Sequence, residues 1–218
     1  MYGCENVKNE NAKNGNTKID IDIDINDYKK INSKTNIDLY KNKNVGKDEY
    51  YINFTIQNNK YDLEQLIETS IINMLKEFNK DLLEDFVIEE NEVKTGDKSY
   101  NNGMIKVYLH SPNKDMGISK KYIHGVFSVE KENSVIHFKC NSEPSQNDDV
   151  IYLNSQKYKK ITLENFEARI DCRNKHHCDF SMLFNINIHE DLPIYMLNMR
   201  GIMIAKICNN LKMFIEQM

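Results

Sequence analysis

The strongest hydrophobic pattern in the chain runs from Ile194 to Met218 and predicts a long C-terminal helix. Apolar residues recur there at spacings of three and four, which places them on one helix face. This stripe comprises Ile194, Leu197, Gly201, Ile204, Ala205, Cys208, Leu211 and Ile215, and it is widened by Met199, Met203, Ile207 and Phe214. A helix that is apolar most of the way round must be enclosed by other structure. We therefore expect a sheet to enclose this one.

Upstream the hydrophobic period changes to two, which is typical of strands. Ile52, Phe54 and Ile56 alternate with polar residues and predict a first strand. β-Branched and aromatic residues predict six more, at 86–94, 104–109, 122–130, 135–140, 159–171 and 179–188. Turn-prone links lie at 95–97, 101–103, 131–133 and 173–175. Strands joined by short polar links predict an antiparallel meander.

A shorter helix is predicted after the first strand. Asp62 is a suitable N-cap, Gln65 stands at the capping-box position, and Tyr61 can pack on Leu66. The apolar face that follows extends to Phe78. The order is then strand, helix, six strands and long helix. This order predicts an α+β domain over residues 47–218, in which a curved antiparallel sheet of about seven strands wraps around the C-terminal helix.

Residues 1–46 are rich in Asn, Lys and Asp and contain few large apolar residues apart from an Ile-Asp alternation at 19–25. The alternation is compatible with a strand, but its low-complexity surroundings favour a disordered tail. We expect this tail to be dispensable for folding.

Composition narrows the functional classes only slightly. The formal charge of −4 gives no indication of nucleic-acid binding. An odd number of cysteines, five, in a chain of 218 residues favours reduced thiols and a cytoplasmic location. The polar start offers no secretion signal, and charged residues interrupt the C-terminal apolar run, so no membrane span is expected.

The element order resembles the helix-grip superfamily, which includes the START lipid-transfer domains, the Bet v 1-like proteins and the polyketide cyclase-like proteins. One sequence feature adds to this resemblance: the alternating strand Phe180–Ile186 leads through the acidic turn at 189–191 and Leu192-Pro193 into the closing helix. The chain has no Trp, whereas START domains contain several, so the shorter helix-grip form fits better than a complete START domain. The resemblance implies a START-like domain that binds a hydrophobic ligand.

Met-rich helix surfaces adapt to irregular apolar partners, and this property suits the wall of a cavity. Met199, Met203 and Ile207 lie beside the main stripe and are our candidates for ligand contacts, together with Phe184 and Arg169. Arg169 alternates with apolar neighbours. It therefore lies outside and pairs with a carboxylate on a neighbouring strand, unless the strand's parity is reversed and it binds an anionic head group. Lys120 and Lys121 are expected to form an exposed pair at a turn.

The segment Cys172–Cys178 is the only dense group of soft metal ligands in the sequence. Cys172, His176 and Cys178 are of the types that zinc takes, but their spacing lacks the paired short gaps of structural zinc sites. We expect a hairpin tip without a metal and without a disulfide. No cofactor and no nucleophile motif are expected.

Two functional classes remain. The first is a non-enzymatic carrier that encloses a lipid or another hydrophobic small molecule between sheet and helix and makes transient membrane contact. The second is a protein-interaction module with a filled core, whose partner the sequence does not identify. A cyclase-like enzyme ranks third, because no convergent polar groups are apparent.

Overall fold

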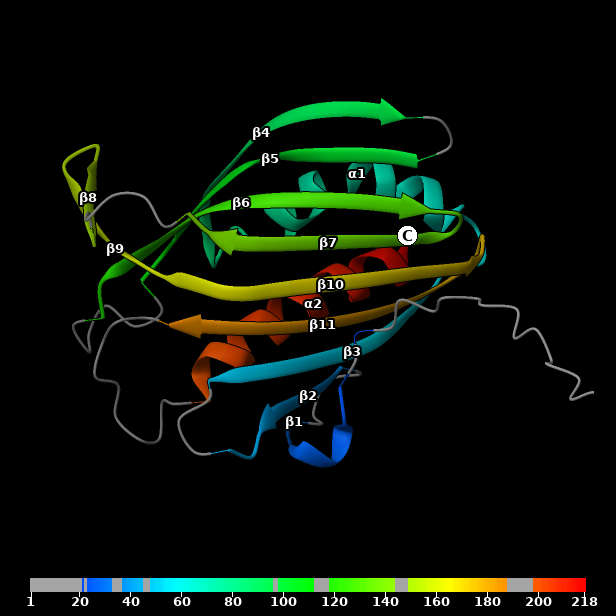
Figure 1. Ribbon diagram of the computed structural model, residues 1–218, viewed down its shortest axis with the longest axis horizontal. Coiled ribbons are helices and arrows are strands. Elements are labelled where there is room, and N and C mark those ends of the chain that lie inside the picture. Colours follow the sequence, from blue (N-terminus) through cyan, green and yellow to red (C-terminus); the bar gives the residue numbers. More distant parts are fainter. Residues whose placement is uncertain are drawn as a thin grey trace, which may run out of the picture.

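A computed structural model describes residues 21, 23–32, 37–44, 48–95, 98–111, 118–143, 149–187 and 198–218 (Figure 1). Its strands are β1 (Tyr28–Asn32), β2 (Asp38–Asn42), β3 (Glu49–Gln57), β4 (Leu83–Thr95), β5 (Lys98–Leu109), β6 (Lys120–Glu132), β7 (Val135–Ser142), β8 (Val150–Leu153), β9 (Gln156–Lys160), β10 (Thr162–Asn174) and β11 (His177–Asn187). Its helices are the short 3-10 helix η1 (Ile25–Asp27), α1 (Leu63–Phe78) and α2 (Met199–Gln217).

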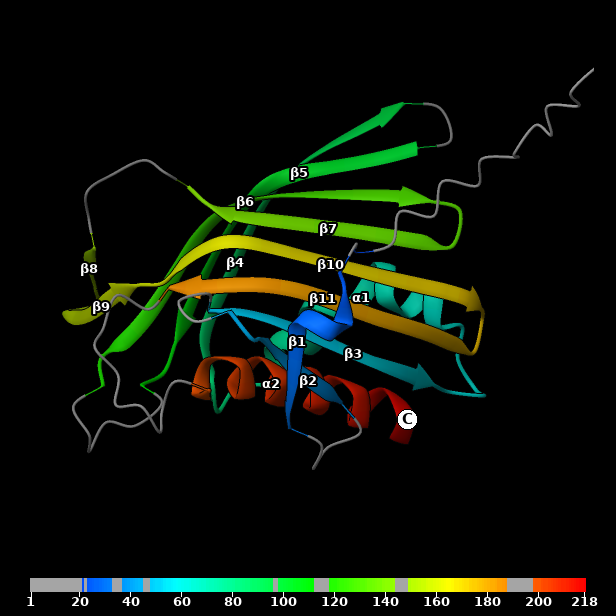
Figure 2. The ribbon, with the colours of Figure 1, turned by 60° about the horizontal axis from the view of Figure 1, so that its bottom comes forward.

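The strands form one curved sheet in the order β1-β2-β3-β11-β10-β7-β6-β5-β4. Neighbours along this path are antiparallel, whereas β9 pairs in parallel with β6 and carries β8 beside it. Both α1 and α2 lie on one face of the sheet, which we call the inner face (Figures 1 and 2). The predicted α+β helix-grip architecture is thus confirmed.

The alternating pattern of the central strands explains which side chains face the helices. On β11, Cys178, Phe180, Met182, Phe184 and Ile186 are buried, and the residues between them are only partly covered. The facing residues of β3 follow the same period, and the register pairs Phe54 with Phe180 and Tyr50 with Phe184. A one-residue slip would turn every one of these side chains to the other face, so the pattern determines the register.

Helix α1 is confirmed, and it begins where its cap predicts. The Asp62 side chain accepts a hydrogen bond from the Gln65 backbone N–H at 3.3 Å. Phe78 at the other end stacks on Phe214 of α2, with ring centroids 3.6 Å apart. The two helices therefore cover the inner face as a contacting pair.

Helix α2 buries Gly201, Ala205, Cys208, Leu211 and Ile215, which belong to the predicted stripe. The predicted start at Ile194, with Leu197 and the acidic turn, lies outside the described residues. Ile202 and Met213 lie outside the predicted stripe and are 44% and 47% exposed. The helix lies against the sheet and α1 with one side open.

The boundary predicted at residue 46 is also wrong, because β1 and β2 extend the sheet beyond β3. Ile37 and Leu39 are fully buried, and Tyr28 is 8% exposed. A few apolar residues in a polar segment were sufficient to form these strands, because β2 pairs with the edge of β3. Residues 1–20 lie outside the described residues, and the Ile-Asp alternation that is described runs through loop into η1 and not through a strand.

The strand boundaries differ from the prediction at two places. The segment predicted as a single strand at 159–171 divides at Ile161 into β9 and β10, and β8 precedes it. The turn predicted at 101–103 is instead part of β5. A Cβ atom on Gly103 would lie 2.2 Å from the Glu89 carbonyl oxygen and 2.9 Å from the Phe127 ring, so close packing explains this glycine.

Deleting residues 1–46 should destabilise the domain severely, because it removes β1, β2 and the buried Ile37 and Leu39. Each buried side chain of this size contributes about 1.5–3 kcal/mol, against a total stability of about 5–15 kcal/mol for a typical domain. Deletion of residues 1–20 is the control, since every contact named above remains. Equal melting temperatures for the two truncated chains would contradict the assignment of β1 and β2 to the domain.

Candidate functional site

An aromatic ladder crosses the inner face of the sheet. We use this name for Phe127, Phe138, Phe166, Phe184 and Tyr50, which come from β6, β7, β10, β11 and β3. Successive ring centroids lie 5.6, 5.8, 6.2 and 5.5 Å apart. These separations are typical of interacting aromatic pairs. The ladder thus joins strands that are distant in sequence into one apolar surface.

The Tyr50 end of the ladder meets α2 at its first turn. Tyr50 and Phe184 are fully buried, and a Cβ atom on Gly201 would lie only 2.6 Å from the Tyr50 ring. Burial, together with the negative charge of Asp48, raises the pKa of the Tyr50 hydroxyl to about 12. Glycine at position 201 therefore permits the helix to approach this ring closely.

The middle of the ladder is less covered than this end. Phe138 and Phe166 are only half-buried, although both lie on the face that carries the helices. The same is true of other apolar side chains packed against the core from this face, namely Phe86, Ile88, Ile123, Val129 and Ala168. The two helices thus leave several apolar side chains of the inner face incompletely covered.

The candidate contacts on α2 lie beside its buried stripe. Met199, Met203 and Ile207 are half-buried, and Ile207 packs against the core. Phe184 joins α2 indirectly, through its stack with Tyr50. Their role as ligand contacts stays a prediction.

Including Arg169 among the cavity residues is wrong, because it faces the outer side of the sheet. Ile170 on the same strand is buried in the core, and strand alternation turns Arg169 away from the helices. The Arg169 guanidinium contacts the Asp171 carboxylate of its own strand at 2.9 Å, with each side chain 11% exposed. The outward parity was therefore predicted correctly, and this carboxylate partner lies on the same strand.

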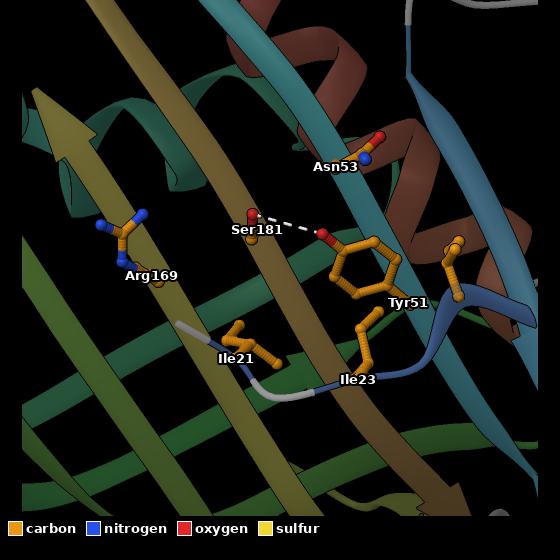
Figure 3. A pocket seen from close by; sticks show the side chains of 7 residues that line it. Ile21, Ile23, Tyr51, Asn53, Arg169 and Ser181 are labelled. Atoms are coloured by element: carbon orange, nitrogen blue, oxygen red, sulfur yellow. Dashed lines mark hydrogen bonds between the residues drawn. The ribbon is translucent and has the colours of Figure 1, made fainter. Parts of the chain in front are cut away.

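Arg169 instead lines a pocket of about 340 Å³ on the outer face (Figure 3). The other lining residues are Ile21, Ile23, Ile25, Tyr51, Asn53 and Ser181. The segment that carries Ile21 and Ile23 crosses the strands on the side opposite the helices. The Tyr51 hydroxyl lies 3.4 Å from that of Ser181, so the floor is polar. The sequence did not predict this pocket, because it depends on how the N-terminal segment crosses three strands.

The hairpin tip between β10 and β11 differs from the prediction as well. Cys172 and Cys178 form a disulfide, so the expectation of reduced thiols at this tip is wrong. The ring Nδ1 of His176 lies 3.0 and 3.1 Å from the carbonyl oxygens of Asn58 and Tyr61. The third candidate metal ligand therefore faces the loop before α1. Within the described residues, no group of three or more acidic, His or Cys side chains is arranged to hold a metal ion.

Lys121 is buried, contrary to the predicted exposed pair. It is 3% exposed and stands opposite Leu109 in the register, on the inner face. Lys120 faces the other way and contacts the Glu84 carboxylate at 2.7 Å. The inner face thus carries a buried cation at the start of β6. Alternation along 121–129 was the available signal, because Lys121 shares the parity of Ile123 and Phe127.

The chain matches no protein-family model and no curated protein sequence. Solved structures do resemble it. Human STARD10 matches with a TM-score of 0.63 and 7% identity over 87% of this chain and 73% of that one. Human StAR-related lipid transfer protein 5 matches with a TM-score of 0.61 and 10% identity over 88% of this chain and 90% of that one. The lipid transfer and protein localization domain of human StarD13 matches with a TM-score of 0.59 and 11% identity over 88% of this chain and 90% of that one.

These likenesses establish that the chain has a START-like helix-grip fold. Sequence identities of 7–11% are too low to transfer an activity, so the comparison defines the architecture alone.

Gly201→Ala should destabilise the protein, by about 1–3 kcal/mol, because the added methyl group overpacks against Tyr50. Helix propensity alone has the opposite sign, since Ala is favoured over Gly by up to about 1 kcal/mol. Chemical unfolding measures the difference, with the exposed Ile202→Ala as control. A more stable Gly201→Ala variant would refute the close approach of α2 to Tyr50.

Reduction should lower the melting temperature, because the Cys172–Cys178 bond constrains the unfolded chain. A loop this short contributes about 2 kcal/mol in the chain-entropy account. The double variant Cys172→Ala/Cys178→Ala should show no response to reductant, which separates this bond from other thiols. If the unaltered protein has the same melting temperature with and without reductant, the disulfide is contradicted.

Proposed function

We propose that this domain binds a lipid or another hydrophobic small molecule on its inner face, between the aromatic ladder and α2, and carries it without covalent chemistry. The observation behind the proposal is the incomplete coverage of Phe138, Phe166 and their apolar neighbours by the two helices. An apolar ligand seated there would be stabilised by about 25 cal/mol per Å² of surface removed from water.

The α2 residues beside this surface suit such a ligand. Met203 and Ile207 lie next to the packed stripe, and an unbranched thioether adapts to chains of different shape. Lys121 adds a cation at the end of the same face, which is a reason to include acidic lipids among the ligands tested. Arg169 has no part in this proposal.

The structural neighbours give the proposal its context. Two of the matched proteins are named for lipid transfer, and none of the three names denotes an enzyme. A carrier therefore remains preferable to a cyclase-like enzyme, and no cofactor is proposed. Within the described residues, no helix is long and apolar enough to cross a membrane. The cytoplasmic location stays a proposal and is weakened by the disulfide, since disulfides persist mainly in oxidising compartments.

The alternative is a protein-interaction module. It is favoured by Ile202 and Met213, two large apolar side chains on the open side of α2 that the rest of the domain leaves exposed. A partner helix could cover them without any ligand on the inner face.

Met203→Trp tests the carrier directly. The protein should take up a fluorescent fatty acid or phospholipid saturably with one-to-one stoichiometry, and the larger side chain should weaken uptake at a modest loss of stability. Met213→Trp is the matched control on the exposed side of α2, and its uptake should be unchanged. Because the chain has no other Trp, energy transfer from each introduced Trp to the probe also reports distance.

Two outcomes would contradict the proposal that the ligand binds on the inner face. One is the absence of binding for every lipid class tried, which would leave the interaction module as the better account. The other is equal weakening by the two Trp variants, which would place the ligand away from the inner face.

A further inference from the structure

A short hairpin of β8 and β9 projects from one end of the sheet (Figures 1 and 2). Its strands join through Asn154 and Ser155, whose φ angles of 48° and 62° form a tight two-residue turn. The hairpin adds no strand to the main path of the sheet. Within the hairpin only Tyr158 is buried, so its exposed tip calls for an explanation other than core formation.

The base of this hairpin is firmly attached. Tyr158 is 2% exposed and packs edge-to-face on Tyr108, with centroids 5.5 Å apart. The Lys120 ammonium lies 5.5 Å from the Tyr158 ring centroid, and β9 pairs with β6. The Ile161 N–H donates to the Tyr122 carbonyl at 2.8 Å, just beyond β9. The tip is thus held out on a fixed support.

The tip of the hairpin exposes two adjacent apolar side chains. Tyr152 is 72% exposed, more than any other large apolar residue in the described part of the chain, and Leu153 is 36% exposed. Lys157 is exposed directly across from Tyr152 in the register, and Lys159 lies across from Val150. On one face of the hairpin Tyr152 and Val150 thus stand opposite Lys157 and Lys159, while Leu153 lies on the other face, opposite Gln156.

The charge of the hairpin is opposite to that of the whole chain. Residues 149–160 contain Lys157, Lys159 and Lys160 against Asp149, while the chain carries −4. A tyrosine beside lysines, with a leucine next to the turn, suits the boundary of an anionic membrane, where rings lie among head groups and ammonium groups reach phosphates. A protein partner has no specific need for an apolar tip flanked by lysines, whereas an anionic bilayer does.

We propose that the β8–β9 hairpin docks the domain on anionic membrane surfaces through Tyr152, Leu153 and the lysines of β9. This inference goes beyond the proposed function, because docking requires no ligand on the inner face. The proposed partner is a bilayer with acidic head groups, and the β8–β9 hairpin is the element that contacts it.

Tyr152→Trp supplies a single fluorophore at the tip, because the chain has no Trp. With vesicles of phosphatidylcholine and phosphatidylserine its emission should shift to shorter wavelength, and with phosphatidylcholine alone the shift should be much smaller. Tyr61→Trp is the matched control: Tyr61 is 42% exposed and precedes α1, beside the β10–β11 turn at the other end of the sheet. Its emission should not change.

Vesicle sedimentation tests the contributing side chains. Lys157→Gln should weaken binding to anionic vesicles about fivefold, in line with the usual contribution of one basic residue near such a surface. Tyr152→Ser/Leu153→Ser should weaken it further, with the melting temperature unchanged because both side chains are exposed. Equal spectral shifts at positions 152 and 61, no shift at position 152, or sedimentation of the double variant equal to that of the unaltered protein would each overturn the proposal.

The assay also separates this inference from the carrier. Uptake of the fluorescent fatty acid in the absence of vesicles should be the same for Tyr152→Ser/Leu153→Ser as for the unaltered protein. Failure of uptake with intact docking would contradict the carrier alone, and failure of docking with intact uptake would contradict the hairpin alone.

Discussion

The contact between α2 and the inner face beside β3 is the interaction on which the rest of the structure depends. The first turn of the helix packs on the Tyr50 ring, and only glycine at position 201 allows that approach. Polar contacts attach the helix further along: the Lys212 ammonium donates to the Thr55 carbonyl at 2.6 Å, and the Asn58 amide donates to the Ile215 carbonyl at 2.5 Å. Because a curved sheet has one apolar concave face, the position of this helix decides how much of that face remains for anything else.

Helix α2 lies nearer to the β2–β3 edge of the sheet than to its middle. The helix contacts β3, β2 and α1, while the middle of the aromatic ladder on β7 and β10 keeps some access to solvent. Stability and the proposed function thus draw on one apolar surface, with the buried end of the ladder holding the helix and the half-buried middle available to a ligand. The outer-face pocket belongs to a different environment, in which the Arg169–Asp171 pair and the tyrosine and serine hydroxyls make the lining polar.

Periodic patterns predicted the elements that bury a regular stripe. The strand at Ile52–Ile56, helix α1 with its Asp62 cap and the buried stripe of α2 all follow from local spacing, because the spacing itself creates the apolar face. The same reasoning failed for β1 and β2, where Ile37 and Leu39 are buried only because β3 offers them an edge. It failed again for Cys172 and Cys178, whose pairing depends on the register of a hairpin. Lys121 was predicted to be a turn residue, although the alternation of β6 places it on the inner face with Ile123 and Phe127. The candidate contacts on α2 were chosen for their place beside the stripe and stay a prediction, whereas the ladder required the alignment of five strands.

Photo-crosslinking tests the central claim most directly. A fatty acid with a diazirine in its acyl chain, bound to the intact protein and activated by light, labels the residues that it contacts, and mass spectrometry of the peptides locates the label. The account predicts modification of the inner face, at Met203 and Ile207 on α2 and at Phe138 or Phe166 on the ladder. Label confined to Tyr51 and Ser181 in the outer pocket, or to the open side of α2 at Met213, would contradict it.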